Sequence, residues 1–399
     1  MNKDKLHLDT QLTHLGRPTE SAGPGVVNTP VYHASTITFP SIAAQDAERK
    51  LRFDGMSYGR NGTPTTFALE EAIAGIEGGY RGIVYPCGLA AIAGALLACV
   101  KSGDHVLMPD SVYGSARKFC GTFLPRYGVA VTYYDPLLGA GVEALIQKNT
   151  RVVYVEAPGS LTFEMQDIPA IAAVAHRHDA LVLMDNTWAT PCYFRSFEHG
   201  VDISIHAATK YIVGHSDAML GLVVTTKEQY LKVREMAAGL GYAAGPDDVY
   251  LALRGLRTMG VRLARHQHNA LIVASWLRAR PEVAEVLYPA LPGARGHDIW
   301  KRDFLGASGL FGVILKPHPN AAVEAMVDGL DLFSIGASWG GFESLVTFPD
   351  PAPMRTATRW PATGPLLRFH IGLEEPADLT ADLERGFARL KQAAAATAY

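Results

Sequence analysis

Short apolar runs alternate with longer helical stretches along most of the chain. Between residues 63 and 225, seven such runs read as strands, and two of them, VVYVEA and LVLMDN, consist largely of consecutive apolar residues. Strands that alternate with helices predict a mostly parallel sheet with helices on both faces, and ligands bind at the carboxyl ends of its strands. Asp185, Glu156 and the YPCG turn fall at such ends. The helices expected between the strands cover residues 88–101, 113–127, 142–148 and 168–178.

Changes in this pattern divide the chain into three parts. Residues 1–62 are rich in Pro, Gly, Ser and Thr and show little periodicity, which predicts an extended arm that packs on something else. Residues 63–257 carry the alternating pattern of a large α/β domain. Residues 258–399 are expected to form a smaller α+β domain, with helices at 258–280, 321–329 and 377–393 and strands in LFGVIL and LLRFHI.

Composition narrows the class of protein without identifying it. The chain has 399 residues, 48% of them hydrophobic and 19% charged, so it can bury a large core. A net charge of -3 with scattered arginines disfavours nucleic acid or anionic membrane as partners and leaves small molecules. A polar N-terminus and the absence of a long apolar segment predict a cytoplasmic protein. The four cysteines and the histidine pairs lack metal-site spacing, so no metal is expected.

A lysine and an aspartate carry the most informative chemistry. Lys210 lies among small residues in SIHAATKYIVGHSDAMLG, and Asp185 ends the apolar run ALVLMD. Free lysine has a pKa of ~10.4, so only about one in a few thousand is neutral at pH 7. A Schiff base with pyridoxal phosphate (PLP) removes this obstacle, and PLP needs an acidic residue to keep its ring nitrogen protonated. For an isolated pair, a surface lysine and a capping aspartate would be the better interpretation, and the surrounding motifs decide against it.

Eight motifs occur in order along the chain and resemble the Cys/Met-metabolism family of PLP-dependent enzymes. They are YGRNGTPT, YPCGLAAI, DSVYGSARKF, EAPGS, DNTWATP, AATKYIVGHSDAM, SWGGFESL and RFHIGLE, from Tyr58 to Glu374. The resemblance implies a fold-type I, aspartate-aminotransferase-like large domain. It also implies PLP as cofactor and a homotetramer, a dimer of dimers, with active sites shared between subunits and the arm contributing to the neighbouring one.

Several residues are candidates for holding the cofactor phosphate. The turn before the 88–101 helix offers the amides of Gly88 and Leu89 at a positive helix end, although a plain strand-to-helix turn would look the same. By the resemblance, Thr209 adds a hydroxyl, while Ala207 replaces a serine that contributes in much of the family. Tyr58 and Arg60 resemble the pair that the family donates to the phosphate in the neighbouring subunit.

A second group of residues is expected to meet the substrate. Tyr113 matches the family tyrosine that stacks on the cofactor ring. Arg368, costly in the apolar run LLRFHI unless paired, suits a substrate α-carboxylate, with an internal salt bridge as the alternative. By the resemblance, Ser338 and Trp339 close the substrate pocket. The EAPGS segment carries Ser160 where the family has an asparagine.

The resemblance is strongest to the β-lyase branch and implies cleavage of L-cystathionine to homocysteine, pyruvate and ammonia. Lys210 would attach the cofactor and move the protons, with Asp185 and Tyr113 assisting. Ser115, where methionine γ-lyases typically carry a cysteine, and Trp339 disfavour γ-elimination. A γ-lyase, a γ-synthase or a broad cysteine-S-conjugate β-lyase stays open. A distant alternative is an α/β-hydrolase, since GASWG fits the GxSxG elbow around Ser338, followed by Asp350 and His370.

Overall fold

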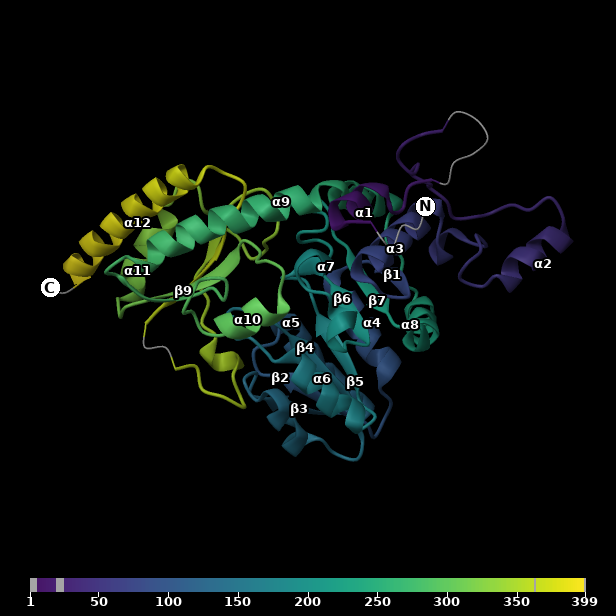
Figure 1. Ribbon diagram of the computed structural model, residues 1–399, viewed down its shortest axis with the longest axis horizontal. Helices are drawn as coiled ribbons and strands as arrows, with labels where there is room; N and C mark the ends of the chain where they lie inside the picture. Colours follow the sequence, from purple (N-terminus) through teal and green to yellow (C-terminus); the bar gives the residue numbers. More distant parts are fainter. Residues whose placement is uncertain (1–5, 19–24, 362–363, 398–399) are drawn as a thin grey trace.

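The computed structural model describes residues 6–18, 25–361 and 364–397. The remaining residues of the predicted arm, 1–5 and 19–24, lie outside this part of the chain. The described arm contains α1 (Leu8–His14), α2 (Ile42–Lys50) and the short helix η2 (Gly59–Asn61). No residue of α2 is buried, and Figure 1 shows this helix standing clear of the rest of the chain. An exposed segment of this kind agrees with an arm that packs on something else.

The large domain is built on a seven-stranded sheet in the order β1-β7-β6-β5-β4-β2-β3. The five strands from β6 to β3 run parallel, and only β7 is antiparallel to both of its neighbours, β1 and β6. The predicted mostly parallel sheet is therefore confirmed. The strands are β1 (Arg81–Tyr85), β2 (His105–Pro109), β3 (Ala130–Tyr134), β4 (Thr150–Glu156), β5 (Leu181–Asp185), β6 (Ile203–His206) and β7 (Gly221–Thr225).

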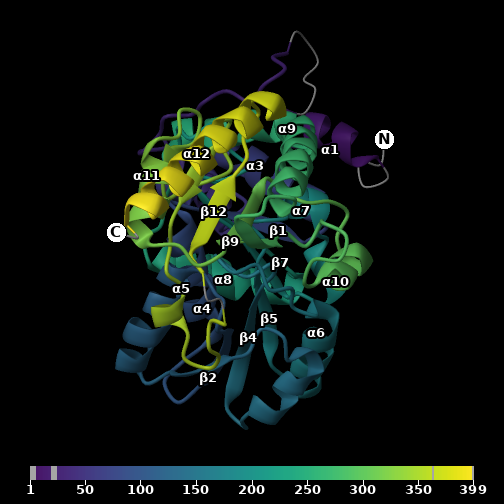
Figure 2. The same cartoon turned by 90° about the vertical axis from the view of Figure 1, so that its left-hand side faces the viewer.

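Helices cover both faces of this sheet, as Figure 2 shows from the side. One face carries α4 (Gly88–Cys99), α5 (Gly114–Lys118) and α8 (Lys227–Gly239), and the other carries α3 (Pro64–Glu77), α6 (Ile168–Arg177) and α7 (Thr190–Tyr193). Two expected helices differ from the prediction. The 113–127 stretch breaks after α5 into a π-helical turn, Phe119–Phe123, and a 3₁₀ turn, Leu124–Tyr127, where Pro125 cannot continue an α-helix. The 142–148 stretch is a 3₁₀ helix, Gly139–Leu145.

The smaller domain packs helices on one mixed sheet. Its strand order is β10-β11-β12-β9-β8, antiparallel except between β10 and β11. The strands are β8 (Val283–Leu287), β9 (Leu310–Leu315), β10 (Ser334–Ile335), β11 (Leu345–Thr347) and β12 (Leu366–His370), and the helices are α10 (His297–Asp303), α11 (Asn320–Asp328) and α12 (Pro376–Thr397). The predicted α+β character is confirmed.

A single long helix, α9 (Pro246–Arg278), joins the two domains. It begins twelve residues before the predicted start at Thr258, because Pro246 fits the first helical turn and Asp247 and Asp248 favour the positive helix end. Its first half packs with α1 and α3, and its second half with β8 and α12. The proposed boundary at residues 257 and 258 thus falls inside this helix. None of the described helices is long and apolar enough to cross a membrane.

Candidate active site

A cavity of about 390 Å³ lies at the carboxyl ends of the parallel strands, where the large domain meets the smaller one. Most of the candidate residues line it from the large domain, and Arg368 and Trp339 line it from the smaller domain. The predicted residues in its wall are Gly88, Leu89, Tyr113, Asp185, Thr209, Lys210, Trp339 and Arg368, together with Glu156, Ser160 and Ala207. The structure therefore brings together side chains that are up to 280 positions apart in the sequence.

Lys210 projects into this cavity from the turn that follows β6. Its Nζ donates a hydrogen bond of 2.6 Å to Ser338 Oγ and lies 5.4 Å from the centroid of the Trp339 ring. Burial and the nearby Arg368 guanidinium lower the pKa of Lys210 to about 8, and Asp185 opposes this change. The amine is thus far closer to neutrality at pH 7 than an exposed lysine would be.

Asp185, the last residue of β5, is a buried carboxylate in the same wall. Its Oδ1 accepts hydrogen bonds from the amide of Thr187 at 3.0 Å and from the Thr187 hydroxyl. Burial raises the pKa of Asp185, while the Thr187 hydrogen bonds, His206 and Lys210 oppose this rise. Glu156 stands directly across from Asp185 on β4, and burial together with Asp185 raises its pKa well above the usual range. Glu156 accepts the amide of Tyr113 at 2.8 Å, which ties it to the next wall.

The N-terminus of α4 forms another side of the cavity. Cys87 is its N-cap residue and makes no side-chain capping bond, so the first amides of this helix are left for another acceptor. Gly88 is required here, because a Cβ at this position would lie 2.6 Å from the Cβ of Ala207. The Thr209 hydroxyl already bonds to Leu220, donating to its carbonyl at 3.2 Å and accepting its amide at 2.9 Å. Thr209 therefore lines the cavity with a hydroxyl that is partly engaged.

Arg368 and Tyr113 both line the cavity. Arg368 Nη2 donates to the carbonyl of Ala337 at 2.9 Å, and no salt bridge to it is found in the described part of the chain. Burial lowers the pKa of the Arg368 guanidinium, and the neighbouring Tyr113 opposes this change. The Tyr113 side chain is 44% exposed, as suits a group that meets a ligand. The internal salt bridge considered for Arg368 is absent among the described residues.

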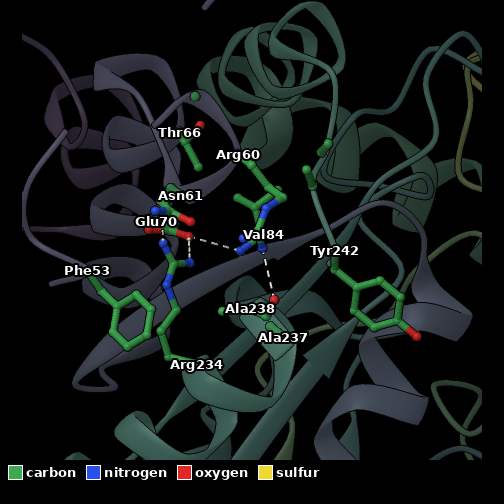
Figure 3. A pocket seen from close by; sticks show the side chains of 13 residues that line it. Phe53, Arg60, Asn61, Thr66, Glu70, Val84, Arg234, Ala237, Ala238 and Tyr242 are labelled. Atoms are coloured by element: carbon green, nitrogen blue, oxygen red, sulfur yellow. Dashed lines mark hydrogen bonds and ion pairs between the residues drawn. The ribbon is translucent and has the colours of Figure 1, made fainter. Parts of the chain in front are cut away.

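Tyr58 and Arg60 lie away from this cavity, and Arg60 lines a separate surface pocket. Arg60 Nη1 donates to the carbonyl of Ala238 on α8 at 2.9 Å, and the same pocket contains Arg234, whose guanidinium bonds to Glu70 (Figure 3). Tyr58 is 45% exposed. Within one chain, therefore, neither residue reaches the cavity that holds Lys210, and the contact with a neighbouring subunit stays a prediction.

Comparisons with known proteins identify the family. The family model described as "Cys/Met metabolism PLP-dependent enzyme" matches residues 9–388. This chain belongs to that family. Relatives include "Cystathionine beta-lyase MetC" of Escherichia coli K12, 44% identical over 96% of this chain and 98% of that protein. An "L-alanine/L-glutamate racemase" of Wolbachia pipientis wMel is 41% identical over 92% and 93%.

A solved structure confirms the predicted fold. The crystal structure of metB from Corynebacterium glutamicum is 32% identical, with a TM-score of 0.90 over 98% of this chain and all of that chain. The fold-type I architecture of the Cys/Met-metabolism family is therefore present here. PLP as the cofactor is confirmed by family membership.

The cavity has the chemistry that PLP requires. An uncapped helix end suits a phosphate, a buried carboxylate suits a protonated ring nitrogen, and an amine with a pKa of about 8 suits an aldehyde. All three groups line one cavity. The residues of this Cys/Met-metabolism enzyme thus fit the cofactor of its family, with Gly88 and Leu89, Asp185 and Lys210 as the groups that would hold it.

The hydrolase alternative is not supported by the geometry. Ser338 lies between β10 and β11, so no helix follows it as a nucleophile elbow requires. The ring nitrogens of His370 contact Tyr211 Oη and the backbone of Gly340 and Gly341, rather than Ser338. Ser338 instead accepts a hydrogen bond from Lys210 Nζ, and family membership also argues against a hydrolase.

Sequence reasoning missed groups that support the site from behind. Thr187, two residues after Asp185, bonds to its carboxylate and also lines the cavity. Glu77 and His206 form a buried pair behind the strand ends, with 2.7 Å between Oε2 and Nε2. The signal for Glu77 is a carboxylate at the end of the apolar stretch AIAGIE, which needs a buried partner.

Proposed function

We propose that this chain cleaves L-cystathionine by β-elimination to homocysteine, pyruvate and ammonia. The observation that carries the proposal is the single cavity that combines Lys210, Asp185 and Arg368 with Trp339. A relative of 44% identity over nearly the whole chain is named a cystathionine β-lyase, which supports the same reaction. Identity alone does not choose the reaction, because a relative of 41% identity is named a racemase.

The large-domain wall provides the cofactor site. PLP, when bound, supplies the electron-accepting ring that stabilises negative charge at the substrate Cα. The amides of Gly88 and Leu89 would hold its phosphate, and Asp185 would accept a hydrogen bond from the protonated ring nitrogen. Tyr113 offers a planar, half-exposed ring to the same cavity.

Lys210 moves the protons of the reaction. When Lys210 Nζ carries no bond to the cofactor, it would remove the proton from the substrate Cα. With a pKa of about 8, about a tenth of such amines are neutral at pH 7, compared with about one in a few thousand for an ordinary lysine. The bond to Ser338 Oγ holds Nζ at the mouth of the cavity, from where it returns a proton to the leaving sulfur.

The smaller domain selects and orients the substrate. Arg368 has donors left after its single bond to Ala337, and its fork suits a bidentate α-carboxylate. Trp339 narrows the pocket beside Lys210 Nζ. With the carboxylate held by Arg368 and the pocket narrowed by Trp339, the substrate would be confined so that β-elimination is favoured over γ-elimination.

The active enzyme is a homotetramer built from dimers that share their active sites. The exposed arm with Tyr58 and Arg60, which does not reach the cavity of its own chain, supports this assembly. In the dimer these two residues bind the cofactor phosphate of the neighbouring subunit.

Product analysis tests the proposed reaction. Purified protein with PLP should convert L-cystathionine to pyruvate and homocysteine with little 2-oxobutyrate, measured by chromatography of the keto acids. Dominant 2-oxobutyrate would make the enzyme a γ-lyase. Conversion of L-alanine or L-glutamate to the D-enantiomer without any keto acid from cystathionine would overturn the proposal in favour of a racemase.

A further inference from the structure

Glu77 is a carboxylate placed where no solvent reaches it. Glu77 is the last residue of α3 and is 2% exposed. It lies behind the ends of β5 and β6 rather than in the cavity. A buried charge is costly unless it is paired and hydrogen-bonded, so the contacts of Glu77 indicate what it stabilises.

The hydrogen bonds of its side chain go mainly to β6 and to the end of β5, the strands that carry the site. Oε2 lies 2.7 Å from His206 Nε2, and Oε1 accepts from Ser204 Oγ at 2.7 Å and from Asn186 Nδ2 at 3.2 Å. Asn186 directly follows Asp185, and His206 stands four residues before Lys210. One carboxylate therefore fixes the segments on which both Asp185 and Lys210 stand.

A continuous set of bonds leads from this pair to the carboxylate of Asp185. The Thr187 hydroxyl donates to Asp185 Oδ1 and accepts the amide of Ala207 at 2.9 Å. Ala207 is the neighbour of His206 in the chain. The other ring nitrogen of His206, Nδ1, is buried with no partner among the described residues, so Glu77 and Ser204, at 2.7 and 3.3 Å from Nε2, fix the ring.

The charges reinforce the geometry. Burial acts to raise the pKa of Glu77, but His206 and the hydroxyls of Ser204 and Ser196 lower it below its usual value. Burial raises the pKa of Asp185, and the hydrogen bonds from Thr187 together with the nearby His206 oppose this rise.

We propose that Glu77 and His206 are positioning residues that hold the carboxylate of Asp185 oriented for the ring nitrogen of the cofactor. Glu77 fixes the His206 ring, and the adjoining bonds from Ala207 to Thr187 and from Thr187 to Asp185 orient that carboxylate. The inference rests on the cofactor chemistry of the proposed function but not on which amino acid is cleaved.

Cofactor selectivity provides the test. Apo-protein is titrated with PLP and with 1-deazapyridoxal 5′-phosphate, in which a C–H group replaces the ring nitrogen. Binding is followed by the fluorescence of Trp188 and Trp339, which line the cavity. Wild-type protein should prefer PLP, whereas Glu77→Gln and His206→Gln should weaken PLP about 3- to 10-fold and leave the analogue unchanged.

Matched variants separate this role from a general loss of structure. Asp185→Asn should abolish the preference for PLP. Glu282→Gln, at a buried carboxylate of the smaller domain that pairs with Lys391 at 2.6 Å, should leave it at the wild-type value. If Glu77→Gln does not fold, His206→Gln carries the test, because it removes the imidazole and keeps a hydrogen-bonding side chain.

Two outcomes overturn the inference. Equal weakening of PLP and the analogue would make the pair merely structural, and unchanged binding of both would remove it from the site. Because no cystathionine enters the titration, a wrong assignment of the reaction would appear in the keto-acid products and leave this result intact.

Discussion

The two walls of the cavity are built in different ways. On the large-domain wall, Asp185, Glu156 and the supporting Glu77 are each buried to 9% exposure or less and each has hydrogen-bond partners. On the wall of the smaller domain, Ser338 is exposed, Trp339 is half-buried, and the Arg368 guanidinium makes one hydrogen bond, to a carbonyl, within the described residues. One wall is fixed in advance, and the other retains unused donors.

This difference separates two tasks. A carboxylate that must stay ionised in a buried place needs rigid hydrogen-bond partners, because rearranging them at each turnover would cost free energy. A guanidinium that must receive many substrate molecules needs free donors and room. The large-domain wall therefore suits a resident cofactor, and the smaller domain suits a substrate that enters and leaves.

The largest effect is expected where the two walls meet, at Lys210. Lys210→Ala should lower turnover of cystathionine by about 10³-fold or more, because both covalent attachment and proton transfer are lost. PLP should still bind non-covalently, since Asp185 and the α4 amides are untouched. Equilibrium dialysis with PLP and a pyruvate assay check both parts, and appreciable pyruvate release by this variant would contradict the role of Lys210.

The next largest effect tests the substrate wall alone. Arg368→Lys keeps the charge but loses the fork, so kcat/KM should fall about 10- to 100-fold while PLP affinity stays unchanged. Arg265→Lys, at a partly exposed arginine that pairs with Glu375 at 3.1 Å, serves as the control. Unchanged kinetics of Arg368→Lys would remove Arg368 from substrate binding.

The rigid wall was more accessible to prediction than its support. Alternating apolar runs placed Asp185 and Glu156 at strand ends, and ordered motifs placed Lys210 and Arg368, because each signal lies within a short stretch of sequence. The pairing of Glu77 with His206 joins positions 129 apart and leaves no local pattern. Its existence depends on how α3 packs against two strand ends.

Hydrogen bonds between groups of the fold itself could not be predicted from the sequence either. The bonds of the Thr209 hydroxyl to Leu220 had no signal in the sequence, and the contact of this hydroxyl with the phosphate stays a prediction. The early start of α9 had a local signal, Pro246 followed by two aspartates, which marks a helix N-terminus even though the apolar periodicity is clearer further along.

A smaller effect is expected from sharing the site between subunits. If Arg60 completes the rigid wall of a neighbour, mixing inactive Lys210→Ala and Arg60→Ala proteins should restore up to about a quarter of wild-type activity. Random pairing makes half of the dimers hybrid, and each hybrid has one intact site of two. Each variant mixed with itself is the control. No recovery after demonstrated subunit exchange would show that each chain is self-contained.

The smallest effect concerns Asp110, the residue that ties the two walls together. Asp110 directly follows β2 and is 2% exposed. Its carboxylate accepts hydrogen bonds from the amides of Thr356, Ala357 and Thr358 of the smaller domain, at 3.0, 3.1 and 2.8 Å. Burial acts to raise its pKa, but these bonds and Arg117 lower it below the usual value of 3.8.

A carboxyl with a lowered pKa in the folded state stabilises the fold above its unfolded pKa and loses this contribution as the pH falls through the folded pKa. Asp110→Asn should therefore lower the free energy of unfolding by about 1 to 3 kcal/mol at pH 7, because an acceptor of several amides becomes partly a donor. The difference from wild type should stay constant between about pH 7 and 5 and shrink below about pH 4. Urea unfolding across this range measures it. A difference that persists undiminished at pH 3 would mean that the charge of Asp110 does not hold the loop, and that the two walls are joined by packing instead.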